Sequence, residues 1–248
     1  MDDRPQAVHN VGMLAALATV VALATPTVDP AHLPSLPPRG LARQTPSGVV
    51  LERFDGRVLG LLRGYHVVIP GATHGLLLHR NTPMRYVLDL AARRVRPVAR
   101  ISRLDGPCTV ADQTPQRALV VCKRHVDVIA GGRRSVVAGP RRGLGRWMWA
   151  EFSPSGKAIL AQWSGECESP TAYLIADGRA RPYGGSDARE SFALGWLSGD
   201  RAVVSFRSGI CGSGFPTPGI YAVPLRGKPQ RLRAFRGRLA PTLAMWGG

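Results

Sequence analysis

The chain has 248 residues, and 33 Lys and Arg residues against 16 Asp and Glu residues give it a formal net charge of +17. Because 44% of the residues are hydrophobic, the composition excludes a wholly disordered chain. The 29 Gly and 21 Pro residues favour a turn-rich β protein over a helical one. Only Lys123, Lys157 and Lys228 are lysines, so arginine supplies most of the basic charge, a bias typical of a GC-rich genome.

Residues 1–24 are predicted to be a signal peptide or a membrane anchor. The segment from Val11 to Ala24 carries no charge and is shorter than the roughly 20 apolar residues of a transmembrane helix. It ends on Ala22-Leu23-Ala24, which is typical of a cleavage site, although the residues before the segment lack the usual net positive charge. Extension of the apolar run to Val28 leaves an uncleaved anchor as the alternative, which would associate the protein with the membrane. Both outcomes predict an extracytoplasmic protein.

Residues 25–47 are predicted to form a Pro-rich spacer, and residues 48–248 the folded domain. Prolines recur throughout the first part of this spacer, and such a composition favours an extended segment over a packed element.

From residue 48 onward, alternating apolar and polar residues between turn residues predict successive antiparallel strands. The first two strands form a hairpin around Asp55-Gly56. Four similar units of four strands follow, at residues 65–100, 109–139, 152–183 and 192–235. A last strand is predicted from Thr242 to Trp246.

The units repeat with a regular period. Arg117, Lys157 and Arg201 open the second strand of three successive units, at spacings of 40 and 44 residues, and Gly75 lies 42 residues before Arg117. Four strands in such a period are typical of a β-propeller blade. The hairpin at residues 49–62 and the last strand would complete a fifth blade from the two ends of the domain. The sequence therefore predicts an all-β protein, a five-bladed β-propeller, with a six-bladed ring or an open array as alternatives.

The segment Phe152–Leu160, FSPSGKAIL, resembles the blade signature of the TolB-like propellers, a family of WD-type repeats. That signature contains an aromatic residue, Ser-Pro, Asp or Ser, Gly-Lys and an apolar strand. Residues 196–204 match it without the proline, and residues 113–121 match it only in outline. The resemblance covers roughly residues 48–248 and implies a propeller that binds other proteins. It implies no enzyme, because the motif builds a turn and carries no catalytic group.

Two disulfides are predicted from the four cysteines, with four buried free thiols as the alternative. None of Cys108, Cys122, Cys167 and Cys211 has the close spacing of zinc ligands, so no metal site is expected. Cys108 and Cys122 each lie seven residues from Pro115 and should face each other across one hairpin. Cys167 and Cys211 are one repeat apart, in equivalent loops of adjacent blades, and should form the second pair.

No phosphate-binding loop, dinucleotide-binding motif, GxSxG or HExxH occurs, and no cofactor is expected. The innermost strands carry His66, Asp112 and Glu151 among mainly small and apolar residues. A carboxylate cluster for a cation or an acid–base pair, or else a solvated acidic loop, is predicted from Glu166, Glu168, Asp187 and Glu190. Two function classes follow. The favoured one is an exported or anchored, non-enzymatic binding module, and the alternative is an extracytoplasmic hydrolase or lyase with its site in the central channel.

Ten basic residues are predicted to lie beside the first-to-second and third-to-fourth turns, which share one face of a propeller. They are Arg93, Arg94, Arg117, Arg133, Arg134, Lys157, Arg179, Arg201, Arg226 and Lys228. Such a face would bind a protein or an anionic envelope component. Specific nucleic-acid binding is not expected, because few aromatic residues lie among these side chains. Codon bias with solvated turns is the alternative explanation of this charge.

Overall fold

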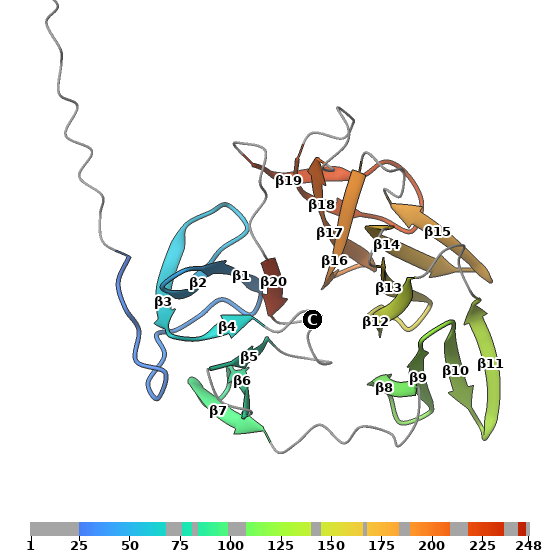
Figure 1. Ribbon diagram of the computed structural model, residues 1–248, viewed down its shortest axis with the longest axis horizontal. Helices are drawn as coiled ribbons and strands as arrows, with labels where there is room; N and C mark the ends of the chain where they lie inside the picture. The colour runs from blue at the N-terminus through green and yellow to red at the C-terminus, as the bar shows by residue number, and fades with distance from the viewer. Residues whose placement is uncertain are drawn as a thin grey trace, which may run out of the picture.

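The segments with alternating apolar and polar residues form strands in the computed structural model (Figure 1). The structure describes residues 25–67, 76–80, 84–98, 108–139, 145–165, 168–183, 189–208, 218–235 and 243–246. These residues form twenty strands. None of them belongs to a helix of the length and hydropathy that crossing a membrane requires. The predicted signal peptide or anchor at residues 1–24 lies outside the described residues.

The strands form five antiparallel four-stranded sheets around a common axis (Figure 1). Blade 1 contains β20 (Leu243–Trp246), β1 (Gly40–Thr45), β2 (Gly48–Glu52) and β3 (Val58–Arg63). Blade 2 contains β4 (His66–Val67), β5 (Leu77–His79), β6 (Arg85–Asp89) and β7 (Arg94–Val98). Blade 3 contains β8 (Cys108–Gln113), β9 (Arg117–Cys122), β10 (Val126–Ala130) and β11 (Arg133–Ala138).

Blade 4 contains β12 (Arg146–Phe152), β13 (Ala158–Gly165), β14 (Glu168–Ala176) and β15 (Arg179–Tyr183). Blade 5 contains β16 (Arg189–Leu197), β17 (Arg201–Ser208), β18 (Gly219–Val223) and β19 (Gln230–Ala234). The predicted five-bladed β-propeller is thereby confirmed.

The second strand of blade 4 shows why a blade needs neighbours on both sides. Along β13, Ile159 and Trp163 pack into the core between blades 3 and 4. Leu160, which points to the other face, packs into the core between blades 4 and 5. All three side chains are buried. A strand covered on both faces needs apolar residues at successive positions, and the run Ala158-Ile159-Leu160-Ala161 supplies them.

Blade 1 closes the ring by pairing the C-terminal strand β20 with β1, and Gly40 faces Trp246 in this ladder. The indole ring of Trp246 lies so close to Gly40 that a Cβ at this position would overlap it. The indole nitrogen donates a hydrogen bond to the carbonyl oxygen of Pro37 at 3.1 Å. The side-chain-free residue at position 40 therefore allows a buried tryptophan to fasten the two ends of the domain.

The predicted boundary between spacer and propeller is wrong, because β1 lies inside residues 25–47 and the propeller begins at Gly40. The Pro-rich segment before β1 is also packed. Its carbonyl groups accept hydrogen bonds from the outer strands, as Pro26 does from the N–H of Leu61 at 2.8 Å and Pro30 from that of Val95 at 2.7 Å. A proline lacks the N–H group but keeps its carbonyl, so such a segment can cover the edge of a sheet without continuing it.

Glutamines, one half-buried and one buried, join neighbouring blades in an equivalent way at two positions. The Oε1 atom of Gln44 on β1 accepts a hydrogen bond from the N–H of Val67 on β4 at 2.8 Å. The Oε1 atom of Gln162 on β13 accepts one from the N–H of Ala193 on β16, also at 2.8 Å. In both cases a second-strand amide holds the first strand of the next blade, so these contacts fix the position of adjacent blades around the axis.

The predicted disulfide between Cys108 and Cys122 is confirmed, with their Cα atoms 4.0 Å apart. Next to the hairpin turn Gln113 faces Ala118, and a regular ladder from this pair would place Cys108 one residue out of register with Cys122. A bulge between Val110 and Asp112 shifts the ladder and brings the two cysteines opposite each other. The predicted pair Cys167 and Cys211 lies outside the described residues.

Candidate functional site

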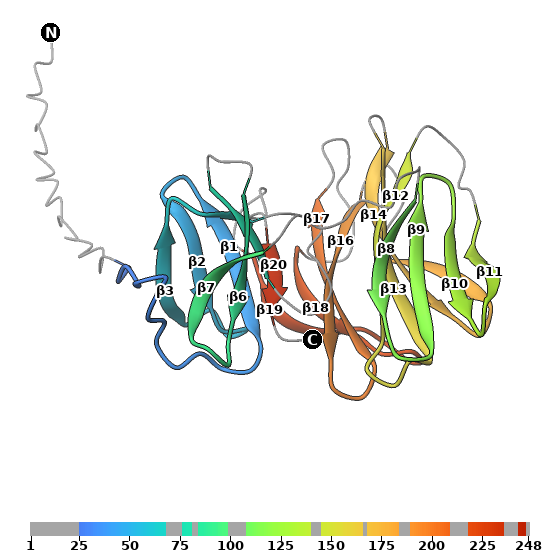
Figure 2. The same cartoon turned by 90° about the horizontal axis from the view of Figure 1, so that it is seen from below.

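Nine of the ten basic residues of the predicted face lie in or directly beside turns between first and second or third and fourth strands. The tenth, Arg134, lies within β11, and its guanidinium reaches away from that turn to pair with Asp127. In a meander these turns share one end of the sheet, and the side view of the ring shows that such ends form one face (Figure 2). We call it the turn face. Arg93 lies in the β6–β7 turn, Arg117 opens β9 and Arg201 opens β17. The binding role of this set stays a prediction.

The turn face also carries acidic residues that the sequence analysis did not assign to it. Asp55, Asp89, Asp177 and Asp200 lie in or beside the same kinds of turn. The carboxylate of Asp177 lies 3.9 Å from the guanidinium of Arg226, and both side chains are exposed. Of the predicted acidic cluster, Glu166 and Asp187 lie outside the described residues, as does the side chain of Glu168. Glu190 is half-buried on β16.

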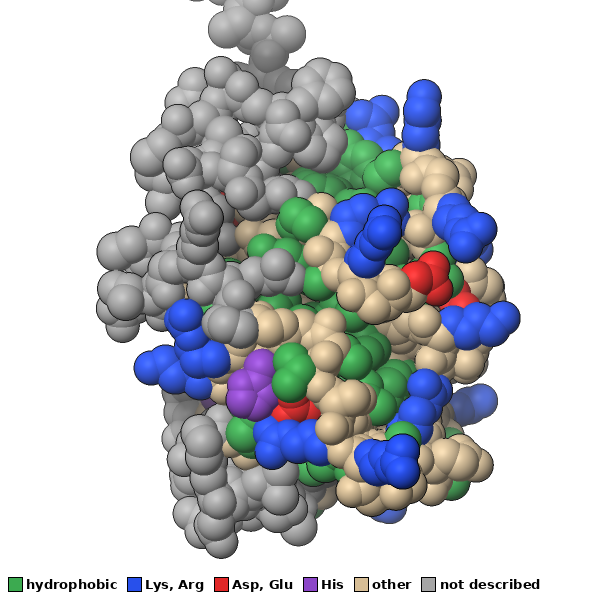
Figure 3. Space-filling model, turned by 90° about the vertical axis from the view of Figure 1, so that its right-hand side faces the viewer, with side chains coloured by type: hydrophobic (Ala, Val, Ile, Leu, Met, Phe, Trp, Pro, Cys, Tyr) green, Lys and Arg blue, Asp and Glu red, His purple; other side chains and the backbone are tan. Residues whose placement is uncertain are grey.

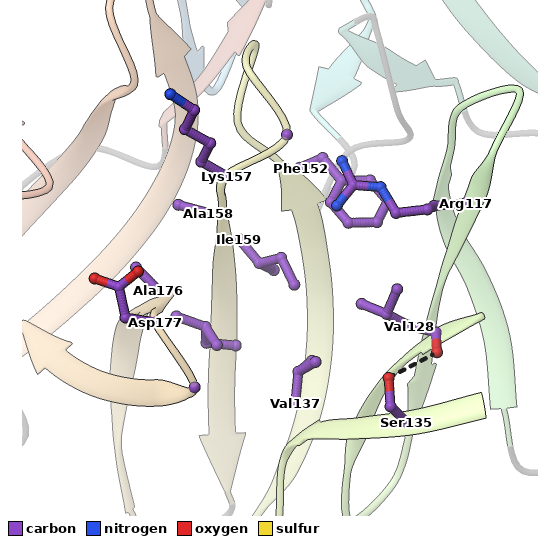
Figure 4. A pocket seen from close by; sticks show the side chains of 13 residues that line it. Arg117, Val128, Ser135, Val137, Phe152, Lys157, Ala158, Ile159, Ala176 and Asp177 are labelled. Carbon is purple, nitrogen blue, oxygen red and sulfur yellow. Dashed lines mark hydrogen bonds between the residues drawn. The ribbon is translucent and has the colours of Figure 1, made fainter. Parts of the chain in front are cut away.

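A groove between blades 3 and 4 lies among these residues and has a volume of about 240 Å³ (Figure 4). Val128, Val137, Ile159 and Ile175 form its apolar walls. Its polar residues come from both blades and are Arg117, Ser135, Lys157 and Asp177. All four apolar residues belong to the core between blades 3 and 4, so the groove lies where this core reaches the surface.

Arg117 extends from β9 across the aromatic ring of Phe152 at the end of β12 (Figure 4). Its guanidinium carbon lies 4.8 Å from the centre of that ring. The guanidinium also passes over Gly156, where a Cβ would overlap its Nη2 atom. Gly156 has a φ of +70° in the β12–β13 turn. This turn is the Ser-Pro-Ser-Gly segment of the sequence motif, and its glycine therefore serves both the turn and the position of Arg117.

Replacing Gly156 by Ala is expected to destabilise the protein by about 1–2 kcal/mol for the left-handed backbone and to displace Arg117 as well. Gly178→Ala is the matched control, because Gly178 has the same φ of +70° but nothing within 4 Å of the position of a Cβ. Urea unfolding of both variants should show a larger loss for Gly156→Ala, by about 0.5–1 kcal/mol for the cation–π contact. Equal losses would show that Arg117 is not held by this contact.

The exposed surface around the groove carries both basic and apolar side chains. Viewed from the side of β11 and β15, apolar side chains occupy the middle of this surface, and Lys and Arg side chains surround them in greater number than acidic ones (Figure 3). Lys157 and Arg133 are exposed, whereas Arg117 is half-buried. This combination fits an anion that has an apolar part, because the walls can cover the apolar part while the cations face the charge.

A second group of functional interest, Asp112 and Glu151, lies on the innermost strands β8 and β12 near the axis. The Oδ2 atom of Asp112 accepts a hydrogen bond from the N–H of Phe152 at 2.8 Å, which joins blade 3 to blade 4. Glu151 is 7% exposed. Burial, together with the negative charge of Asp112, raises the pKa of Glu151 to about 8. The Glu151 carboxyl is therefore mostly protonated at neutral pH.

The third polar residue predicted on an innermost strand, His66, is held between neighbouring side chains. Its ring stacks on that of His79 across β4 and β5, with the ring centres 5.1 Å apart. Its Nδ1 atom lies 3.2 Å from the Nε2 atom of Gln44. These contacts give His66 a role in joining blades 1 and 2.

In comparisons with known proteins, the chain matches no protein-family model and no curated protein. The fold and the groove define a five-bladed β-propeller with a basic, partly apolar groove between two of its blades.

Proposed function

We propose that this protein is an exported or membrane-anchored binding module that holds an anionic envelope component at its turn face. The groove between blades 3 and 4 carries this proposal, because it places Arg117 and Lys157 beside apolar walls that open to the surface. The net charge of +17 adds long-range attraction for such a partner. The disulfide between Cys108 and Cys122 supports a location outside the cytoplasm.

Membership in the TolB-like propellers is part of the same proposal. It is supported by the way Phe152–Leu160 folds, because the aromatic residue ends β12, Ser153 to Lys157 form the turn, and Ala158 opens β13. The hydroxyl oxygen of Ser153 accepts a hydrogen bond from the N–H of Ala158 at 3.1 Å, as a turn-building serine does. The signature residues thus build a blade turn, and Phe152, Gly156 and Lys157 among them also line the groove.

The test is binding of the purified protein to vesicles that contain phosphatidylglycerol, with phosphatidylcholine vesicles for comparison. Binding to the anionic vesicles should weaken steeply as the salt concentration rises from 10 to 150 mM, because the Debye length falls from about 30 Å to about 8 Å. Each basic residue near an anionic surface contributes about 1 kcal/mol, so Lys157→Ala should weaken binding about fivefold at low salt.

Arg63→Ala is the matched control for Lys157→Ala. Arg63 is also exposed, but it ends β3 and so lies at the opposite end of its blade from the turn face. This variant should bind within about twofold of the wild type, since it keeps every cation of the turn face. Absence of binding at low salt, or equal losses in the two variants, would overturn the proposal.

A hydrolase or lyase with a site near the axis is the second candidate, and the protonated Glu151 favours it. A carboxyl group with a pKa of about 8 can serve as a general acid at neutral pH. Glu151→Gln separates the two candidates because it removes that acid and leaves the groove intact. A binding module keeps its vesicle binding in this variant, and an enzyme loses turnover on any substrate identified for it.

A further inference from the structure

Four side chains of blade 3 bring metal-ligating atoms together at the end of the blade away from the turn face. Cys108 opens β8, Cys122 ends β9, and His125 lies in the short β9–β10 connection. The two sulfur atoms and a ring nitrogen of His125 lie within 4.8 Å of one another. The Oδ2 atom of Asp127, on β10, lies 3.2 Å from the Nε2 atom of His125 and 3.9 Å from the Sγ atom of Cys122.

A cationic group already lies among these four atoms. The Nη2 atom of Arg134 lies 3.3 Å from the Sγ atom of Cys122 and 3.9 Å from that of Cys108. It also lies 3.1 Å from the Nε2 atom of His125 and forms a close ion pair with the Oδ2 atom of Asp127. One nitrogen of the guanidinium is therefore surrounded by two sulfurs, one imidazole nitrogen and one carboxylate oxygen.

Asp127 gives a second and independent sign that this place suits a cation. Its side chain has no exposed surface, and its Oδ1 atom has no hydrogen-bond partner among the described residues. A buried carboxylate is costly unless positive charge compensates it. Arg134, which supplies that charge, is 53% exposed and can turn its long side chain into solvent.

We propose that the reduced form of this cluster is a Zn²⁺ site, with Cys108, Cys122, His125 and Asp127 as ligands and Arg134 as the group that zinc replaces. Two thiolates, one imidazole and one carboxylate are ligands that zinc takes in tetrahedral sites. The cross-strand pairing of β8 and β9 supplies the close cysteine pair that the spacing in sequence does not show. The guanidinium of Arg134 thus occupies the site when the cysteines are oxidised, and Zn²⁺ occupies it when they are reduced.

The conversion needs an external dithiol as reductant. One thiolate of the dithiol attacks a sulfur of the Cys108–Cys122 disulfide, which forms a mixed disulfide and releases one cysteine thiolate. The second thiol of the dithiol then attacks the mixed disulfide and releases the other cysteine thiolate. Two electrons and two protons pass to the protein, which gains two thiols while the dithiol becomes a disulfide. Binding of Zn²⁺ then displaces the two thiol protons into solvent. Oxidation by a disulfide of the same class reverses these steps and releases the metal.

The test uses Co²⁺ as a spectroscopic probe of the full-length protein, since cobalt in a tetrahedral thiolate site gives a charge-transfer band and intense visible bands. The reduced protein should bind about one equivalent of Co²⁺ with these bands, and Zn²⁺ should displace it. The oxidised protein should give no such bands. Cys167→Ser with Cys211→Ser should keep the bands, and Cys108→Ser with Cys122→Ser should lose them.

Variants of the other groups distinguish a built site from two reactive thiols. His125→Ala and Asp127→Asn should each weaken Zn²⁺ binding to the reduced protein about tenfold or more. Arg134→Ala should bind Zn²⁺ at least as tightly as the wild type, because it removes the competing cation, and Lys123→Ala should leave binding unchanged. The proposal is overturned if the His125 and Asp127 variants bind like the wild type, or if Arg134→Ala binds more weakly. It is also overturned if circular dichroism shows that reduction alone unfolds the sheets.

Discussion

We expect the free energy of unfolding to fall as the pH rises from about 4.5 to about 8, and Glu151→Gln to abolish most of this fall. The pKa of Glu151 is raised from 4.5 to about 8 by burial and by Asp112, so the folded protein holds a proton that the unfolded chain releases. The contribution of Glu151 to the free energy of unfolding is complete below its pKa in the unfolded chain. It is lost as the pH rises through its pKa in the folded protein. A single proton gives a slope of about 1.4 kcal/mol per pH unit.

The neutral variant should match the wild type near pH 4.5 and exceed its stability at pH 8 by on the order of 4 kcal/mol. Denaturant titrations followed by tryptophan fluorescence at several pH values measure both profiles. The difference between the two proteins isolates the Glu151 site, because all other residues are the same in both. Parallel profiles would show that Glu151 does not hold a proton in the folded state.

A change of the opposite sign is expected at the other buried glutamate, Glu52. Its carboxylate is 1% exposed and lies 3.2 Å from the guanidinium groups of both Arg43 and Arg233. Arg233 is on β19 of blade 5, so this group joins the last full blade to blade 1. Glu52→Gln should destabilise the protein by about 2–3 kcal/mol, the range for hydrogen bonds to charged groups, because both arginines lose a buried counter-charge.

The measurement is the same denaturant titration at pH 7, and Glu190→Gln is a suitable control, since Glu190 is half-buried and should change stability by less than about 0.5 kcal/mol. The difference in stability between the wild type and Glu52→Gln should stay the same at high salt, because salt screens the buried ion pairs of the wild type only weakly. A variant as stable as the wild type would indicate that Arg43 and Arg233 do not depend on the charge of Glu52. Replacing a buried glutamate by glutamine is thus expected to stabilise the protein at Glu151, whose charged form is disfavoured by burial, and to destabilise it at Glu52, whose charge is balanced by two arginines.

The period of the blades was predictable from the sequence because several blades repeat the same turn followed by an apolar strand. Arg117, Lys157 and Arg201 follow a tight turn and open an apolar strand, and a turn followed by such a strand is a local pattern that a single sequence displays. The strand β1 was missed because it lies among prolines, and its partners are β2 and a strand at the far end of the chain. Pairing between distant segments leaves no local pattern.

The site was less predictable than the fold. The groove depends on the distance between two blades, which the packing of Phe152 and Ile159 against blade 3 determines. The proposed zinc site needs Cys108 and Cys122 to face each other, and this predicted pairing rests on a bulge between Val110 and Asp112 that the prediction did not include. A bulge has no reliable mark in one sequence. The polar residues after Cys122 were visible, but only the ladder shows that they meet the two cysteines.

Closure of the ring by β20 has a consequence for how the chain folds. The contact between Trp246 and Pro37 joins residues 209 positions apart, whereas each of blades 2 to 5 pairs strands that are close in sequence. Contacts between distant residues form late, because the entropy of a long loop must be lost first. Until β20 arrives, β1 presents an unpaired edge to its surroundings. In that interval the β20 of a second copy can occupy the same edge, so rapid refolding at high protein concentration should produce strand-swapped dimers.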